Sequence, residues 1–281
     1  VAAAAAAARA RDTLQTEANL PVMTSPIFFG MLPGWTSAEL QRLILQRRSC
    51  HELNPNASIS LPDFLETLRV AMPSVAPFGM LPYSRPLVPL AVFFVHRVQG
   101  LTPGLYAFVR DETRLHWLRG ACAGRPYLWQ RVFKAGNVPL FLLEAGDASD
   151  LAYRSSSQQE VARSGVASCA VFMEYQPLLC EFGTWLYKRG HWEAGMVIQA
   201  MYLAAEAVGN RGTAMGAFLG PWTHSALGIS SELLQVVELW TFGQAVEDSR
   251  LETSLGYHHL AKLRTQGNSP RTRDAIPTEG Y

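Results

Sequence analysis

The sequence is poor in charge and in cysteine, and it has no long uninterrupted hydrophobic run. Charged residues make up 17% of its 281 residues, compared with about 25% in ordinary globular domains. Lys and Arg number 24 and Asp and Glu 23, so the net charge is +1 and gives no electrostatic basis for binding nucleic acid or an anionic membrane. The four cysteines are scattered without a Cys-x-x-Cys pair, so neither a structural zinc site nor a disulfide scaffold is indicated. The longest apolar segments, 86–95 and 194–209, are too short or too interrupted to span a bilayer.

The sequence is rich in apolar residues, which make up 48% of the chain. A high apolar fraction with almost no net charge excludes a disordered protein. The same composition predicts a large buried core, an extensive permanent interface, or both.

The two ends differ in composition from the middle. Seven alanines follow Val1, two arginines come next, and no acidic residue precedes Asp12. This pattern resembles the end of an organelle transit peptide, for a mitochondrion or a chloroplast, and the alternative is an Ala-rich helical arm of the mature protein. The tail after Gln266 has Gly, Pro and mixed charges without periodicity. We therefore expect an N-terminal arm at 1–35, one domain at 36–260 and an extended tail at 261–281, with both arms contacting a partner surface.

Local patterns predict helices and strands that alternate along the domain. Thr36 to Glu39 forms a capping box that starts one helix, and Ser60 starts a second. Apolar runs predict buried strands at 86–95, 139–143 and 236–242, and a helix at 192–208 that is buried on most of its faces. Strands at 104–109 and 115–118 are expected to form a hairpin, and a long helix is expected from 157–160 to Pro177. Short links between strands require antiparallel neighbours, so the prediction is an α+β fold with one sheet and a buried central helix.

The sequence lacks most catalytic signatures. It has no G-x-S-x-G nucleophile elbow, no phosphate-binding P-loop and no H-E-x-x-H, and its seven histidines show no ligand spacing, so no metal site is predicted. One cluster is compatible with ligand binding. Arg47 and Arg48 precede Ser49, and two guanidinium groups beside a hydroxyl suit a phosphate monoester. The alternative for these arginines is surface charge at the end of a helix.

Several segments resemble the FMN-dependent nitroreductase family. Residues 47–51 (RRSCH) are similar to its opening R-R-S-x-R, and residues 72–74 (MPS) to its P-S turn. Residues 95–106 (VHRVQGLTPGLY) resemble a stretch of a subgroup that has two nitroreductase-like halves in one chain and is akin to the dehydrogenases of azole-forming peptide biosynthesis. Weaker matches continue at 156–162, 192–195, 202–207, 211–213 and 246–251. In order and spacing, the resemblance covers most of the chain.

The resemblance implies a nitroreductase-like fold, with a central mixed, mostly antiparallel sheet surrounded by helices, and an FMN at a dimer-type interface. It implies three groups of cofactor-binding residues, near the flavin phosphate, near the isoalloxazine and in the loop beneath the ring. These groups are Arg47, Arg48, Ser49 and Arg250; Glu193 and Gly195; and Gly212, Thr213 and Gly216. The implied reaction is two-electron transfer from NAD(P)H or a substrate, carried by the flavin without a protein nucleophile.

The sequence also departs from the family. His51 replaces the last basic residue of R-R-S-x-R, Ala214 replaces a glycine, and Gly220-Pro221 replaces an acidic pair. Only one of the subgroup's two halves is present, so a second nitroreductase-like half or copy, or other subunits, is the expected partner. Two functions therefore remain open, an FMN-dependent oxidoreductase and a catalytically degenerate structural subunit of a larger assembly. An unrelated α+β hydrolase is the least supported alternative.

Overall fold

The computed structural model describes residues 35–75, 86–252 and 254. The N-terminal arm (apart from Trp35), the C-terminal tail and the predicted import signal lie outside the described residues. Within the described residues, no helix is both long and apolar enough to cross a membrane.

One seven-stranded sheet in the order β3-β4-β2-β1-β5-β7-β6 organises the fold, and all pairings between its strands are antiparallel. The strands are β1 Leu90–Val95, β2 Gly104–Val109, β3 Gln130–Arg131, β4 Leu140–Ala145, β5 Ala167–Glu174, β6 Arg211–Met215 and β7 Leu234–Gly243. A single parallel bridge, between Ile59 and Val98, lies outside these strands within the described residues. The α+β class is confirmed.

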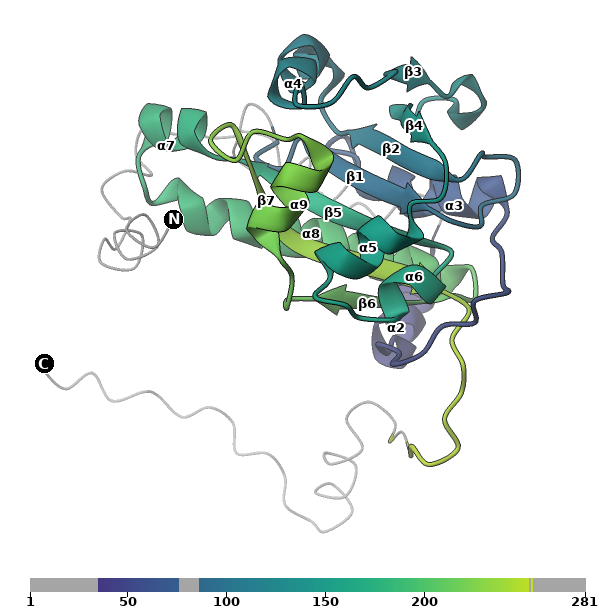
Figure 1. Ribbon diagram of the computed structural model, residues 1–281. Coiled ribbons are helices and arrows are strands. Elements are labelled where there is room, and N and C mark those ends of the chain that lie inside the picture. The colour runs from purple at the N-terminus through teal and green to yellow at the C-terminus, as the bar shows by residue number, and fades with distance from the viewer. Residues whose placement is uncertain (1–34, 76–85, 253, 255–281) are drawn as a thin grey trace, which may run out of the picture.

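Helices cover both faces of this sheet (Figure 1). The helices are α2 Ser37–Gln46, α3 Leu61–Arg69, α4 Leu115–Ala121, α5 Ser149–Ser155, α6 Val161–Ser164, α7 Gln176–Phe182, α8 Leu186–Ala207 and α9 Gly220–Leu227, with short 3-10 turns η4 Glu112–Arg114 and η5 Phe133–Ala135. The long helix α8 lies behind the sheet in Figure 1 with α2 and α3 packed on it, while α5, α6 and α9 lie in front. The predicted central helix is confirmed, although one stripe of it is exposed.

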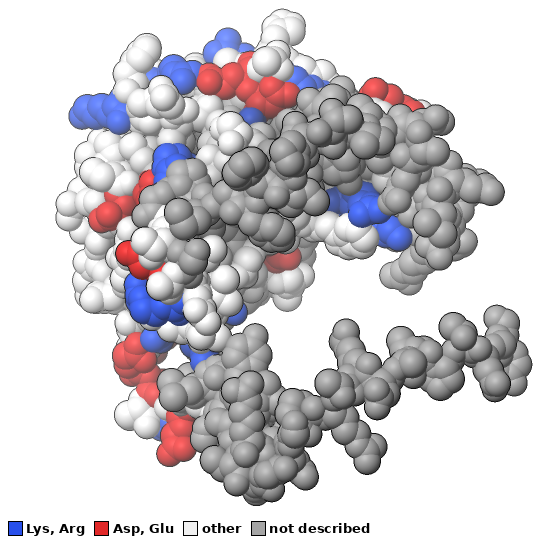
Figure 2. Space-filling view, turned by 180° about the vertical axis from the view of Figure 1, so that it is seen from behind, with Lys and Arg blue, Asp and Glu red and all other residues white. Residues whose placement is uncertain are grey.

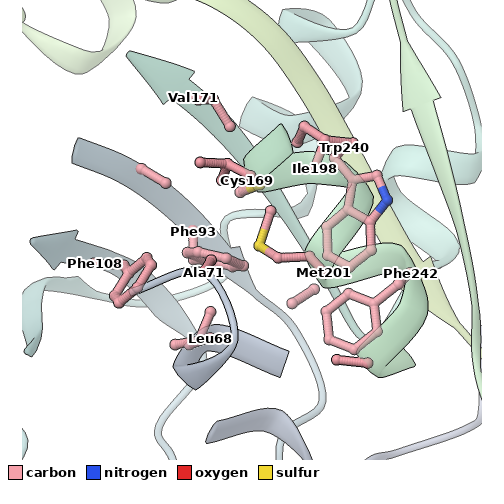
Figure 3. Close-up of a cluster of buried hydrophobic side chains, with 14 of the residues drawn as sticks. Leu68, Ala71, Phe93, Phe108, Cys169, Val171, Ile198, Met201, Trp240 and Phe242 are labelled. Carbon is pink, nitrogen blue, oxygen red and sulfur yellow. The ribbon is translucent and has the colours of Figure 1, made fainter. Parts of the chain in front are cut away.

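One layer of the hydrophobic core lies on each face of the sheet. All six residues of β1 are buried, with Phe93 in the layer beneath α8 and α3 and Phe94 in the layer beneath α5, α6 and α9. Figure 3 shows the first layer, where Met201 of α8 points toward the aromatic rings of the strands. Trp240 and Phe242 of β7 stack there with ring centroids 4.8 Å apart. The buried strand predicted at 86–95 is therefore confirmed for 90–95, which is buried on both faces, whereas 86–89 is not part of the strand.

The N-terminal helices begin where the capping signals placed them. The Thr36 hydroxyl accepts the Glu39 N–H and the Glu39 carboxylate accepts the Thr36 N–H, which completes the capping box of α2. The Ser60 hydroxyl accepts the Asp63 N–H at 3.3 Å and caps α3. Each cap satisfies backbone donors that the first turn leaves without partners.

The predicted hairpin at 104–118 is wrong. The Asp111 carboxylate accepts the Thr113 N–H at 3.1 Å and nucleates η4, and the chain continues as α4. Leu118 and Ala121, three residues apart, are buried on one face of α4. β2 pairs instead with β1 and β4.

The predicted long helix from 157–160 to Pro177 is also wrong. Ser157 and Gln158 have φ values of 55° and 63°, which a right-handed helix does not allow. Only the four residues of α6 are helical before the chain enters β5, whose eight residues are all buried. Pro177 lies in the first turn of α7, where its missing N–H has no intrahelical partner to lose.

Candidate functional site

The residues predicted to hold a flavin phosphate lie where α2 ends. Arg47 is the C-cap of α2 and has extended backbone angles, so the chain leaves the helix there and runs toward β6, the edge strand of the sheet. Thr213 of β6 holds this segment, since its hydroxyl donates to the Cys50 carbonyl at 2.6 Å and accepts the Cys50 N–H at 3.2 Å. Burial also raises the pKa of the Cys50 thiol. The predicted Thr213 therefore lies beside the predicted Arg47 and Ser49, with its hydroxyl engaged by Cys50.

Tyr202 of α8 joins the two sides of this cluster. Its hydroxyl lies 3.4 Å from the Ser49 hydroxyl and accepts the backbone N–H of Ala214 in β6. The Arg47 guanidinium lies over the Tyr202 ring, 4.8 Å from its centroid, within the range of a cation–π interaction. Tyr202 was not among the residues predicted from the sequence, although it is the first residue of the matched segment 202–207. Its signal was a single hydroxyl on an otherwise apolar stretch of helix.

Arg48 and Arg250 point their guanidinium groups at other partners. Arg48 donates to the carbonyls of Leu45 at 2.9 Å and of Ser254 at 3.2 Å, so it closes the end of α2 and holds the chain that follows β7. Arg250 is largely exposed and pairs with Asp248 at 2.7 Å. No direct contact between Arg250 and Arg47 is present among the described residues, although Ser254 brings this part of the chain close to α2.

Gly212 and Thr213 lie in strand β6 and not in a loop as predicted, and the predicted site glycines differ in their packing. A Cβ on Gly212 would lie 2.5 Å from Nε1 of Trp240, so the packing of that indole requires a glycine. A Cβ on Gly195 or Gly216 would meet no atom within 4 Å, because both positions face open space. Ala214 in β6 does not have a positive φ, so its side chain causes no backbone strain.

Arg47, Ser49, Cys50, Tyr202 and Thr213 form what we call the Arg47 cluster. Glu193 is buried and lies outside this cluster. It forms an ion pair with Arg110 and accepts the backbone N–H groups of Leu87 at 2.8 Å and Val88 at 3.4 Å. Arg110 in turn donates to the carbonyls of Ala71 and Val88, each at 2.7 Å. Glu193 is nine residues from Tyr202 along α8, about 13 Å. We call Arg110 and Glu193 the buried clamp, because together they hold the chain on both sides of segment 72–86.

The remaining donors of the Arg47 cluster suit a phosphate monoester. No hydrogen bond or ion pair of the Arg47 guanidinium is present among the described residues, and Ser49 is an exposed residue whose hydroxyl lies beside that of Tyr202. A guanidinium and a hydroxyl at the end of an extended segment can donate together to phosphate oxygens. Within the described part of the chain, no three His, Cys, Asp or Glu residues group as metal ligands.

The charges on the visible described surface are few and mixed. Figure 2 shows small blue and red patches separated by broad white areas. This surface agrees with the low charge content of the sequence.

No protein-family model and no curated protein matches the sequence. Solved structures do match. A structure described as a nitroreductase from Anabaena variabilis aligns with 16% identity and a TM-score of 0.56 over 74% of this chain, and the chain spans only 38% of that protein. A second such structure, from Ralstonia eutropha, aligns with 15% identity and a TM-score of 0.52, over 74% of this chain and 84% of that one.

A third match is a chain of the Escherichia coli microcin synthetase McbBCD complex with truncated pro-MccB17 bound. It has 15% identity and a TM-score of 0.52, over 85% of this chain and 84% of that one. At such identities the likeness establishes the fold alone. The chain has the nitroreductase fold.

Proposed function

We propose that this protein is an FMN-binding subunit of an oxidoreductase, which holds the flavin phosphate with Arg47 and Ser49. The observation that carries the proposal is the arrangement of these two side chains around Tyr202 at the open edge of β6. Arg47 has no carboxylate partner among the described residues, so its charge is available to a phosphate.

The other residues of the cluster would shape this site rather than contact the phosphate. Thr213 fixes the extended segment through Cys50, and Tyr202 sets the position of Ser49 and of the β6 backbone. Arg48 closes α2 so that Arg47 is the first residue to leave the helix. A bound FMN would supply two-electron transfer, which no side chain of the protein performs.

We propose further that a second nitroreductase-like unit completes the site. α8 has an exposed stripe that contains Gly195, Gln199 and Trp192, whose side chain is 53% exposed. The loop after β6 adds Leu219, which is 45% exposed. On α8, the exposed Trp192 lies about one turn from Gly195, which has no side chain, so another chain can approach this stripe closely. The likeness to a chain of the McbBCD complex supports a role within an assembly.

The alternative is a structural subunit without catalytic activity. Three of the predicted cofactor-binding residues already have partners within the protein, which favours this alternative. Thr213 bonds to Cys50, Arg250 pairs with Asp248, and Glu193 pairs with Arg110. In that case the Arg47 cluster has only an architectural role.

Titration of the purified protein with FMN, followed by quenching of flavin fluorescence, separates the two functions. The FMN-binding proposal predicts saturable binding, weakened at least tenfold by Arg47→Ala because a charge-assisted hydrogen bond is lost. Arg42→Ala is the control, since Arg42 lies on the exposed face of α2 and bonds only to Gln46 among the described residues. A folded protein that binds no FMN would favour the structural alternative, whereas equal binding by both variants would overturn the assignment of the phosphate to Arg47.

A further inference from the structure

Two segments that are far apart in the sequence meet beyond the end of β6. One is the loop 216–219, which joins β6 to α9, and the other is the end of α5 with the turn that follows it. The Gln159 side-chain amide donates to the Ala217 carbonyl at 2.9 Å, and the Leu219 N–H donates to the Ser155 carbonyl at 2.9 Å. α5 and α9 also contact each other in front of the sheet (Figure 1). The loop is therefore held to a second segment at two points.

The turn after α5 has an unusual backbone. Ser157 and Gln158 have φ values of 55° and 63°, in the left-handed region that residues other than glycine seldom adopt. Gln159 closes this turn, since its amide also donates to the Ser156 carbonyl at 2.8 Å. The buried Ser156 donates its hydroxyl to the Tyr153 carbonyl at 2.9 Å. Left-handed residues of this kind persist where surrounding contacts hold them, and they gather at ligand sites, so the turn is a candidate functional segment.

The loop lies on the side of the Arg47 cluster that suits an aromatic ring. Only residues 208–210 separate α8 from β6, so the strand runs back along the helix, and the Ala214 N–H meets the Tyr202 hydroxyl. The loop after β6 therefore continues toward the exposed stripe of α8 that precedes Tyr202. At the other end of β6, Arg211 pairs with Glu247 at 3.1 Å. The loop side thus offers uncharged surface to a flavin ring, whereas the opposite side carries an ion pair.

We propose that Gln159 is a positioning residue of the flavin site, which holds the loop 216–219 beside the ring. The inference rests on the flavin binding proposed above. The Gln159 amide carries two N–H donors, one for its own turn and one for Ala217, so a single side chain fixes the turn and the loop together. Next to this contact, a Cβ on Gly216 would meet no atom within 4 Å, so the loop backbone is open to a flat ring.

Comparing FMN with riboflavin, which lacks the phosphate, tests this assignment. In flavin fluorescence titrations of the full chain, Gln159→Leu should weaken the binding of both flavins about fivefold, because loss of the hydrogen bond to Ala217 frees the loop. Arg47→Ala should weaken the binding of FMN alone. Gln159→Lys, which restores N–H donors, should recover part of the affinity. Gln130→Leu is the matched control, since Gln130 is also exposed and lies in β3, at the opposite edge of the sheet.

A measurement without flavin tests the contact itself. The Leu219 N–H should exchange with deuterium faster in Gln159→Leu than in Gln130→Leu, because the freed loop exposes this donor more often. A native chain that binds no flavin would overturn the proposed function and this inference with it. Equal flavin binding by Gln159→Leu and Gln130→Leu would overturn this inference alone, as would a loss of affinity confined to FMN or an unchanged exchange rate.

Discussion

The buried clamp gives a quantitative prediction about stability. The Arg110 and Glu193 side chains are 0% and 2% exposed, and burial lowers the pKa of Arg110. Removing one member of such a pair leaves a buried charge without a counter-charge, which costs about 4 kcal/mol. We therefore expect Glu193→Leu and Arg110→Met each to reduce the free energy of unfolding by about 4 kcal/mol.

The double variant separates the charges from the backbone groups that the clamp also satisfies. With both charges gone, the remaining cost among the described residues comes from four backbone groups, the Leu87 and Val88 N–H groups and the Ala71 and Val88 carbonyls. At about 1 kcal/mol each, the double variant should lose about 4 kcal/mol rather than the 8 kcal/mol or so that independent effects would give. Urea unfolding at pH 7, followed by tryptophan fluorescence, measures all three losses.

A surface ion pair provides the control for this cycle. Glu66 and Arg69 on α3 pair at 2.5 Å with side chains 33% and 36% exposed, so Glu66→Gln should change the free energy of unfolding by less than about 1 kcal/mol. Additive losses in the clamp variants would refute the reasoning, because they would show that the two buried charges do not depend on each other. Glu193→Gln, which keeps an acceptor for one N–H, extends the measurement if a larger change prevents folding.

Two further predictions concern buried groups. Burial lowers the pKa of His96 to about 4, whereas a histidine in the unfolded chain has a pKa near 6.5. As the pH falls, the unfolded chain therefore binds this proton before the folded protein does. The free energy of unfolding should fall by about 3 kcal/mol between pH 6.5 and pH 4. The variant His96→Gln should show a shallower loss in urea unfolding across that pH range, and an unchanged slope would contradict this assignment. Gly212→Ala should cost about 2 kcal/mol through overpacking against Trp240, whereas Gly195→Ala, in open space within a helix, should stabilise by up to about 1 kcal/mol. Thermal melting compares the two, and equal shifts would show that the contact with Trp240 does not constrain Gly212.

Local signals in the sequence predicted most of the framework. Capping residues placed the starts of α2 and α3, and continuous apolar runs placed β1 and the central helix, because these features depend on neighbours within a few residues. The two errors have a different origin. Asp111 caps the 3-10 turn η4, from which the chain continues into α4. Strand β5 follows a segment in which Ser157 and Gln158, neither of them glycine, have positive φ. In both places side-chain periodicity over a few residues favoured the wrong element.

The candidate site was only partly predictable. Arg47, Ser49 and Thr213 were identified through resemblance and lie together, but the role of Tyr202 depends on contacts between residues far apart in the chain. Glu193 lies in a motif that the resemblance places near the flavin, yet its carboxylate binds Arg110 and two backbone N–H groups. Which groups pair with a buried carboxylate depends on how α8 packs against the rest of the protein, and the residues next to Glu193 in the sequence do not indicate it. The organelle import predicted from the N-terminal arm stays a prediction.

The hydrogen bonds between Cys50 and Thr213 also bear on the order of folding. The two residues are separated by 163 positions in the chain. Closing so long a loop costs conformational entropy, which two hydrogen bonds cannot offset until other native contacts have formed. During synthesis the segment after α2 leaves the ribosome early, but its binding partner on β6 is made only near the end of the domain. The Arg47 cluster should therefore form late, after the central strands have paired, and it should open first when the protein is destabilised.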